Sequence, residues 1–393
     1  MLRSVANHVL TALLAVGLTA SGCSSGGVRQ EPELAPTRGS LSSAVELDHR
    51  RLPSARSEAL ITYGSANARD EPITVTGTVS VPAAPPPPGG WPVISWAHGT
   101  TGTADACAPS ADRPGGPAHS YVGLVDQVLD RWVAAGYAVV RTDYEGLGTP
   151  GEHPYLNGVS EANTVVDIVR AARRANPGIG ADWFAMGHSQ GGQAALFAAA
   201  ERVRSEVPLR AAVAIAPGGF QVDRTAEFFR ARAGTPEVTA ALPFLSPLLL
   251  GAAAADPGIA ADELVADEIR PLLEVGRTGC QDDVREAAAR MRPQRVFRDD
   301  AELGPLTAYL RSQDPSRLAL GVPTLVLQGT DDALVGKPGT DQLVGMLCRR
   351  SGQVSYRVYD GAEHRQVLAE SLPDAERFVD AVRAGRPPAG TCT

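Results

Sequence analysis

Ser189 occupies a position where a strained turn could activate a hydroxyl group. Residues 187–191 read Gly-His-Ser-Gln-Gly, the G-x-S-x-G pattern of a turn that raises a serine between a strand and a helix. An apolar run precedes the turn at residues 182–187, and an alanine-rich stretch predicted as a helix follows from Gln190 to about residue 204. The N-terminus of such a helix stabilises negative charge at the reacting centre. The pattern therefore predicts a nucleophile at Ser189.

A serine hydroxyl is a weak nucleophile, so it needs a general base, and the base needs a group that orients it. In chains that carry this kind of turn, the acid and then the histidine follow the serine, each on a loop after a strand. His364 follows the last predicted strand and is the candidate base. His188, the neighbour of the serine, is predicted to pack within the turn instead.

Two adjacent aspartates could orient the base. Asp331 and Asp332 both follow a strand predicted at residues 323–328. The spacing G-x-x-D-x-x-V in residues 329–335 favours Asp332 as the acid. Asp331 stays open as the alternative, and the aspartate that is not the acid would cap the turn or the next helix.

The oxyanion of an acyl-transfer reaction needs two N–H donors. The amide of Gln190, directly after the nucleophile, is the expected first donor. The second should come from the loop after the strand predicted at residues 91–97, which begins His-Gly-Thr-Thr. Thr100 is the predicted donor, because it follows the His-Gly pair. The alternative is that these small residues only form a tight turn.

No cofactor and no metal site are predicted. Residues 146–151 fit the dinucleotide pattern G-x-G-x-x-G after a strand, but His153 and Pro154 follow where a helix would have to begin. Without a helix N-terminus nothing would hold a pyrophosphate. The sequence also has no C-x-x-C or H-x-x-x-H spacing, which are common arrangements of zinc ligands.

Alternating strands and helices predict an α/β protein with a mostly parallel central sheet and helices on both of its faces. Strand-like runs are absent from about residue 221 to residue 318, a segment that is helical in pattern and broken by prolines. This segment is too long for a loop. We predict an α/β core from residues 51–220 and 319–393, with residues 221–318 inserted as a helical cap.

Within the predicted cap, residues 238–255 are almost free of charge. They could span a membrane, but Pro243, Ser246 and Pro247 argue against that. The sequence favours a bent pair of apolar helices that lines a substrate pocket. Because apolar walls reward each added methylene by about 0.8 kcal/mol, we expect short or medium acyl chains to be preferred over acetyl.

The first residues read as an export signal. Residues 1–23 combine a basic start, an apolar run and small residues before Cys23. The segment resembles a bacterial lipobox, in which Cys23 is lipid-modified, although Ala20 stands where a leucine is usual; ordinary secretion is the alternative. Residues 24–50 read as a disordered tether. Ser24 lies in a second G-x-S-x-G match, residues 22–26, but no strand or helix is predicted around it.

Composition fits an exported globular protein. The formal net charge is −8, which argues against nucleic-acid binding. Four cysteines remain besides Cys23, and an even number in an exported chain indicates two disulfides. The preferred pairing joins Cys348 to Cys392 and Cys107 to Cys280.

The chain resembles the secretory lipase family, lipase-A-type α/β-hydrolases, and its bacterial relatives in three stretches. They are residues 96–110 (Trp-Ala-His-Gly-Thr-Thr-Gly-Thr-Ala-Asp-Ala-Cys-Ala-Pro-Ser), residues 142–151 (Thr-Asp-Tyr-Glu-Gly-Leu-Gly-Thr-Pro-Gly) and residues 187–192 (Gly-His-Ser-Gln-Gly-Gly). All α/β-hydrolases share the third stretch, whereas the first two are more particular to this family. The resemblance covers roughly residues 55–390.

This resemblance implies a serine carboxylester hydrolase with a helical cap between the sixth and seventh strands. Carried over by position, Ser189, Asp332 and His364 match the family's triad. The match is poorer in the cap, so an acyl-chain preference does not transfer from the family.

The sequence thus predicts an exported lipase or esterase that acts on a small-molecule or lipid ester through an acyl-enzyme on Ser189. It would touch the membrane only through a lipid at Cys23. The same three residues would also serve a peptidase or amidase, which is the alternative. A remote alternative is a non-catalytic protein that binds components of the cell envelope.

Overall fold

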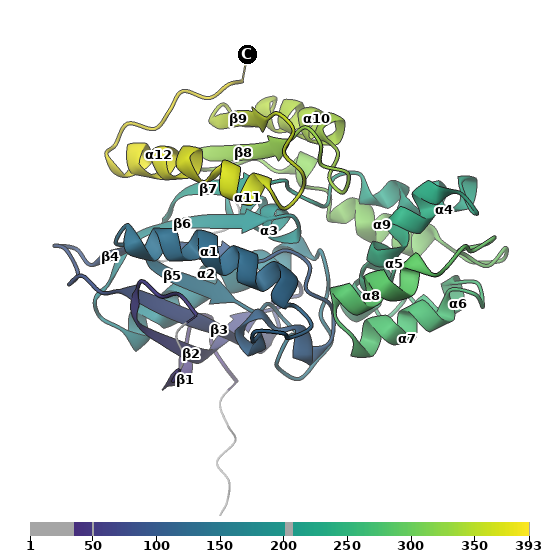
Figure 1. The fold of residues 1–393 in the computed structure, drawn as a ribbon, viewed down its shortest axis with the longest axis horizontal. Coiled ribbons are helices and arrows are strands. Elements are labelled where there is room, and N and C mark those ends of the chain that lie inside the picture. Colours follow the sequence, from purple (N-terminus) through teal and green to yellow (C-terminus); the bar gives the residue numbers. More distant parts are fainter. Residues whose placement is uncertain (1–34, 49–50, 201–206, 393) are drawn as a thin grey trace, which may run out of the picture. The chain divides into compact units, whose positions relative to one another are not determined.

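A single mixed sheet forms the centre of the protein (Figure 1). The structure is a computed structural model that describes residues 35–48, 51–200 and 207–392. The predicted leader, Cys23 and Ser24 lie outside the described residues, as does the first part of the predicted tether.

Within the described residues, nine strands pair in the order β1-β2-β3-β5-β4-β6-β7-β8-β9. The pairs β1–β2, β2–β3 and β3–β5 are antiparallel, and the remaining pairs are parallel. The strands are β1 (Leu41–Glu46), β2 (Ala55–Ala66), β3 (Pro72–Pro82), β4 (Trp91–Ala97), β5 (Ala138–Thr142), β6 (Ile179–His188), β7 (Leu209–Ile215), β8 (Thr324–Gly329) and β9 (Val354–Tyr359). The predicted α/β fold with a mostly parallel sheet is confirmed.

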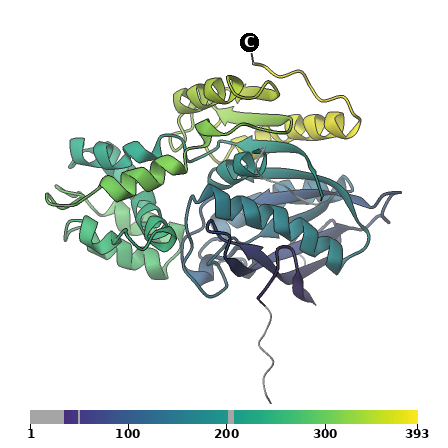
Figure 2. The same ribbon diagram turned by 180° about the vertical axis from the view of Figure 1, so that it is seen from behind.

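Helices cover both faces of this sheet. One face carries α1 (His119–Ala134), α11 (Val367–Glu370) and α12 (Leu372–Arg383), which lie in front of the sheet in Figure 1. The other carries α2 (Gly158–Ala175), α3 (Gln190–Ala198) and α10 (Lys337–Cys348), which come to the front in Figure 2.

The central strand β4 explains why both faces must be covered. All of its residues are buried, and successive side chains point to opposite faces of the sheet. Val93 packs in the core beneath α2, whereas Ile94 packs in the core beneath α1. A strand that is apolar on both sides is stable only between two layers of helices.

The boundary predicted for the tether is wrong for residues 41–46. They form β1, which pairs with β2 through contacts such as Val45 opposite Leu60. Most side chains of β1 are exposed, so the strand is held by backbone hydrogen bonds at the edge of the sheet rather than by burial. A strand of this kind leaves little hydrophobic pattern in the sequence.

The segment between β7 and β8 is helical and has a hydrophobic core of its own. It contains η3 (Val222–Arg224), α4 (Thr225–Ala231), α5 (Pro236–Ala255), α6 (Ala261–Leu264), α7 (Arg270–Thr278), α8 (Gln281–Ala289), α9 (Gly304–Ser312) and η4 (Pro315–Arg317). We refer to residues 221–318 as the cap.

The long apolar stretch of the cap is one continuous helix, α5, and not the bent pair that was predicted. Pro247 has no N–H to donate to the carbonyl of Pro243, four residues earlier. The side chain of Gln281 in α8 replaces that donor, with Nε2 at 3.0 Å from the Pro243 carbonyl oxygen. By length and composition α5 could cross a membrane, and 50% of its most apolar window is buried within the protein.

Both predicted disulfides are present. Cys107, in the loop after β4, is bonded to Cys280 at the start of α8 in the cap. Cys348, at the end of α10, is bonded to Cys392 near the C-terminus. The first bond therefore joins the loop of the predicted oxyanion donor to the cap.

The close approach of α5 to the core gives a test of the packing. A Cβ atom at Gly251 would lie 2.4 Å from the backbone nitrogen of Tyr155, which cannot move without its loop. Gly251→Ala should therefore lower the free energy of unfolding by about 1–3 kcal/mol, measured by denaturant titration.

Gly345 is the matched control for this substitution. It also lies inside a helix, α10, and the nearest atom to its added Cβ would be the end of Arg349, 3.8 Å away. Gly345→Ala should leave stability unchanged or raise it by up to about 1 kcal/mol, because alanine favours the helix. Equal effects of the two substitutions would contradict the proposed contact.

Candidate active site

Ser189 lies on the strained turn between β6 and α3. Its φ is 59° and its ψ is −116°, outside the ordinary regions for a residue with a side chain. A Cβ atom at Gly187 would lie 2.1 Å from the carbonyl oxygen of Gly191, and one at Gly191 would lie 1.9 Å from the carbonyl oxygen of Ala97. Glycine is thus required on both sides of the serine.

Asp332, and not Asp331, contacts His364. The Nδ1 atom of His364 lies 2.7 Å from Oδ2 of Asp332. The other carboxylate oxygen of Asp332 accepts hydrogen bonds from the amides of Leu334 and Val335, at 2.9 and 2.8 Å. Asp331 is exposed, and its carboxylate accepts a hydrogen bond from the hydroxyl of the preceding residue.

The environment of Asp332 keeps it ionised. Burial alone would raise the pKa of this carboxyl, but the hydrogen bond to His364, the charge of His364 and the two amide donors together lower the pKa below its usual value. An ionised Asp332 fixes the proton on Nδ1 of His364 and leaves Nε2 as the ring nitrogen that could accept a proton.

His188 connects the turn to the loop of His364. Its Nε2 atom lies 2.8 Å from the backbone carbonyl oxygen of His364, so Nε2 carries the hydrogen and donates it. Its Nδ1 atom accepts a hydrogen bond from the hydroxyl of Tyr121 at 3.2 Å. The Tyr121 oxygen in turn accepts from the amide of Gly99 at 2.7 Å. Burial lowers the pKa of His188 well below its usual value, which keeps this arrangement neutral.

The amides of Gln190 and Thr100 are free to bind a ligand. Within the described chain neither N–H has a hydrogen-bond acceptor, whereas the neighbouring amide of Gly99 is engaged by Tyr121. The Thr100 hydroxyl lies 2.9 Å from the hydroxyl of Tyr155, a residue that lines the same cavity as Ser189. The structure thus places the Thr100 loop close to this cavity.

A cavity of about 680 Å³ opens at Ser189. Its wall is mostly apolar and combines the loop after β7 with α4 and α5 of the cap. The side chains contributed by α5 are Glu237, Ala240, Ala241, Phe244, Leu245 and Leu248. The cap therefore contributes mostly apolar groups to the wall of this cavity, a composition common in ligand pockets.

A family model described as "Serine aminopeptidase, S33", a hydrolase family, matches residues 118–371. This is well over half of the chain. The chain belongs to this hydrolase family. No curated protein matches the sequence.

Solved structures similar to this S33-family chain share its fold. Lipase A of Candida antarctica has a TM-score of 0.74 and 18% identity, over 91% of this chain and 84% of that one. The rice cell wall degrading esterase LipA of Xanthomonas oryzae has a TM-score of 0.68 and 21% identity, over 89% of this chain and 98% of that one. A putative hydrolase of Legionella pneumophila has a TM-score of 0.67 and 20% identity, over 86% of this chain and 98% of that one. The predicted resemblance to lipase-A-type α/β-hydrolases is confirmed at the level of the fold.

The first two stretches that carried the resemblance pack against each other. Asp143 accepts hydrogen bonds from the amide of Ser110 at 2.8 Å and from its hydroxyl. The hydroxyl of Tyr144 donates to the carbonyl of His98 at 2.9 Å. Together they support the loop that carries Thr100.

Sequence reasoning missed the buried polar group behind Gln190. The Nε2 atom of Gln190 donates to Oε1 of Glu161 at 2.7 Å and to Nε2 of His153 at 3.0 Å. His153 is fixed in turn by its Nδ1 hydrogen, which it donates to the carbonyl of Glu145 at 2.8 Å. Burial lowers the pKa of His153 to about 3, so the ring is neutral. No motif marks Glu161 or His153, because their role depends on contacts between distant segments.

Glu161 is a protonated carboxylic acid near neutral pH. Burial raises its pKa from 4.5 to about 8, although the hydrogen bonds from Gln190 and from the amide of Leu156 oppose this shift. Its second oxygen is buried and has no hydrogen-bond partner in the described chain. The proton therefore resides most naturally on that oxygen, while the first oxygen accepts from Gln190.

Glu161 should make stability depend on pH. The carboxyl group of Glu161 keeps its proton up to about pH 8 in the folded protein but releases it near pH 4.5 in the unfolded chain. The free energy of unfolding therefore decreases as the pH rises between these two values. The substitution Glu161→Gln removes the titratable carboxyl group and keeps a side chain of nearly the same size and shape. Relative to wild type, this variant should gain up to about 1.4 kcal/mol of unfolding free energy per pH unit between pH 5 and 8.

Glu152 provides the control for this measurement because its side chain is exposed. Denaturant titrations of wild type, Glu161→Gln and Glu152→Gln at several pH values are compared. A constant difference between wild type and Glu161→Gln across the window would rule out a buried acid at this position.

Proposed function

We propose that this α/β-hydrolase is an exported serine hydrolase that cleaves carboxylic esters, a lipase or esterase. The observation that carries the proposal is the His364–Asp332 pair, 2.7 Å apart, on a loop that His188 joins to the turn of Ser189. The apolar cavity at Ser189 supports an acyl chain as the bound group. Lipase A and the LipA esterase, which share the fold, carry names that agree with this proposal.

In the proposed mechanism the hydroxyl oxygen of Ser189 attacks the ester carbonyl carbon while its proton moves to Nε2 of His364. The carbonyl oxygen becomes an oxyanion that the amides of Gln190 and Thr100 bind. His364 then gives the proton to the leaving alcohol, which leaves an acyl-enzyme. Water, deprotonated by His364, attacks the acyl carbon and releases the acid and Ser189. Asp332 holds the imidazole in its orientation throughout.

The alternative is a peptidase or amidase with the same residues, as the description of the family names an aminopeptidase. An aminopeptidase needs carboxylates that bind the substrate's free amine. Among the described residues that line the cavity, Glu237 is the one carboxylate, and it stands at the start of α5. The absence of a pair there favours an ester substrate. A non-catalytic protein that binds the cell envelope is a remote third possibility.

The proposed roles predict different losses of activity when each of the two adjacent aspartates is replaced by asparagine. Ser189→Ala should lower kcat by at least about 10³-fold, and Asp332→Asn by about 10⁴-fold through loss of the correct tautomer. Asp331→Asn is the matched control and should stay within about threefold of wild type, since its side chain points to solvent. Steady-state hydrolysis of 4-nitrophenyl butyrate measures all three. Equal losses at the two aspartates would refute the role of Asp332.

Substrate preference separates the proposed function from its alternatives. We expect kcat/KM to rise from acetate to short or medium-chain 4-nitrophenyl esters and then to level off, because each added methylene gains about 0.8 kcal/mol in an apolar pocket. Aminoacyl 4-nitroanilides should be poor substrates. Faster cleavage of the anilides would favour the peptidase, and failure of a fluorophosphonate to label Ser189 would favour the binding protein.

Export and lipid attachment are a further part of the proposal. Two disulfides fit an oxidising compartment, and the predicted lipobox would place a lipid on Cys23. Radiolabelled palmitate should enter the wild-type protein in a bacterial host and should not enter Cys23→Ser. Label in neither protein, with both found in the medium, would indicate free secretion instead.

A further inference from the structure

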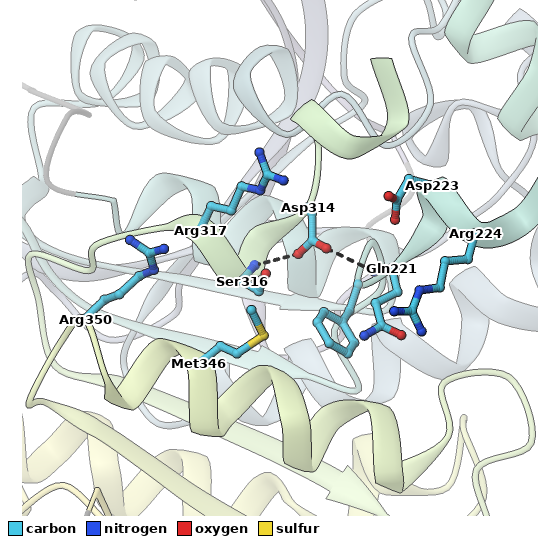
Figure 3. A pocket seen from close by; sticks show the side chains of 9 residues that line it. Gln221, Asp223, Arg224, Asp314, Ser316, Arg317, Met346 and Arg350 are labelled. Carbon is cyan, nitrogen blue, oxygen red and sulfur yellow. Dashed lines mark hydrogen bonds between the residues drawn. The ribbon is translucent and has the colours of Figure 1, made fainter. Parts of the chain in front are cut away.

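A second pocket, of about 500 Å³, lies where the cap leaves the core and rejoins it (Figure 3). One wall is the segment after β7 that leads into η3, and another is η4 with the residue before it. The end of α10 and the turn after it close the pocket. It adjoins the cavity at Ser189, and six of its nine lining residues do not line that cavity.

Three arginines line this pocket. In the described chain, the side chains of Arg224, Arg317 and Arg350 make no hydrogen bond and no ion pair. They come from η3, from η4 and from the turn after α10, and Figure 3 shows them around the same space, with Arg224 on the opposite side from the other two. A guanidinium group presents several donors in a plane that matches a carboxylate or a phosphate.

The two carboxylates of the pocket do not neutralise these arginines. Asp314 accepts hydrogen bonds from the amide of Ser316 at 2.8 Å and from the amide of Gln221 at 3.3 Å, so it serves to shape the loop. Asp223 forms an ion pair with Arg311, which lies outside the pocket, at 3.1 Å. Positive charge therefore prevails here, in a protein whose formal net charge is −8.

The arginine pocket, the second pocket just described, adjoins the cavity at Ser189. Phe220, Gln221 and Arg224 line both spaces. An acyl chain that lies along the apolar wall of the cavity at Ser189 would therefore reach the second pocket at these shared residues. The order of environments along this path is thus the reacting serine, an apolar stretch and then a cationic end.

We propose that the enzyme prefers esters whose acyl chain ends in an anionic group, a carboxylate or a phosphate, and that the arginine pocket binds this group. The inference rests on the proposed esterase function of Ser189 and goes beyond it, because it names the far end of the acyl chain. An uncharged chain end offers these guanidinium groups no acceptor with a full charge. A polyanion such as a nucleic acid would need a much wider basic surface.

Three sets of 4-nitrophenyl esters test the proposal. They share an unbranched acyl chain of four to twelve carbons that ends in a carboxylate, a phosphate monoester or a methyl ester. We expect kcat/KM for one or both anionic sets to exceed that of the methyl esters about tenfold at an optimal chain length, chiefly through KM. Because the arginines are exposed, 1 M NaCl should remove most of this preference. A higher value for one anion identifies the headgroup.

The variants Arg317→Gln and Arg350→Gln, alone and combined, should abolish the preference for the anionic esters and leave the methyl esters unchanged. The combined Arg317→Lys and Arg350→Lys variant should retain part of it. Arg349→Gln is the matched control, since Arg349 is exposed next to Arg350 but does not line the pocket.

The outcomes separate the two levels of the argument. If no ester of any set is hydrolysed, the proposed function fails. If the methyl esters are hydrolysed but the anionic esters have no advantage at any chain length, only the inference about the arginine pocket is overturned. It is also overturned if Arg349→Gln removes the preference as fully as Arg350→Gln does, because the charge would then act without the pocket.

Discussion

The strained backbone at Ser189 is the constraint on which the rest of the site depends. The turn is possible only because Gly187 and Gly191 bring the end of β6, the start of α3 and the end of β4 into direct contact. That contact places the loop after β4 beside the serine. Gly99 in this loop is held as closely, since a Cβ atom there would lie 2.7 Å from the hydroxyl of Tyr121. One strained residue therefore determines where the neighbouring amides lie.

Hydrogen bonding separates the roles of three histidines that lie close to the serine. Both ring nitrogens of His188 and of His153 are engaged, each ring with a backbone carbonyl on one side. Burial keeps both rings neutral by lowering their pKa values. His364 has one nitrogen on Asp332 and the other free in the described chain, which is the condition for a base. The same geometry leaves His188, the immediate neighbour of the serine, without a free ring nitrogen.

The sequence allowed the sheet and the helical segment between β7 and β8 to be predicted, because burial on two faces and turn residues leave periodic patterns. Both disulfides were predicted on another ground, the even number of cysteines besides Cys23. The sequence did not reveal β1, whose exposed side chains have no such pattern. The spacing of residues 329–335 favoured Asp332 over Asp331, but the contact with His364 depends on which carboxylate turns inward after β8. Glu161 was not predictable, since it sits within a helix and meets Gln190 only through the folding of α2 against α3.

A disulfide and a hydrogen bond connect the cap to the loop after β4, which carries Thr100. The disulfide between Cys107 and Cys280 is reinforced by the amide of Gln281, which donates to the carbonyl of Thr101 at 2.8 Å. Gln281 also supplies the donor that α5 lacks because of its prolines. One residue thus connects the helix that lines the cavity with the loop that carries Thr100. The groups that would select the acyl chain and those that would stabilise the oxyanion are thus connected by covalent and hydrogen bonds, so we expect a change in the packing of α5 to affect the loop that carries Thr100.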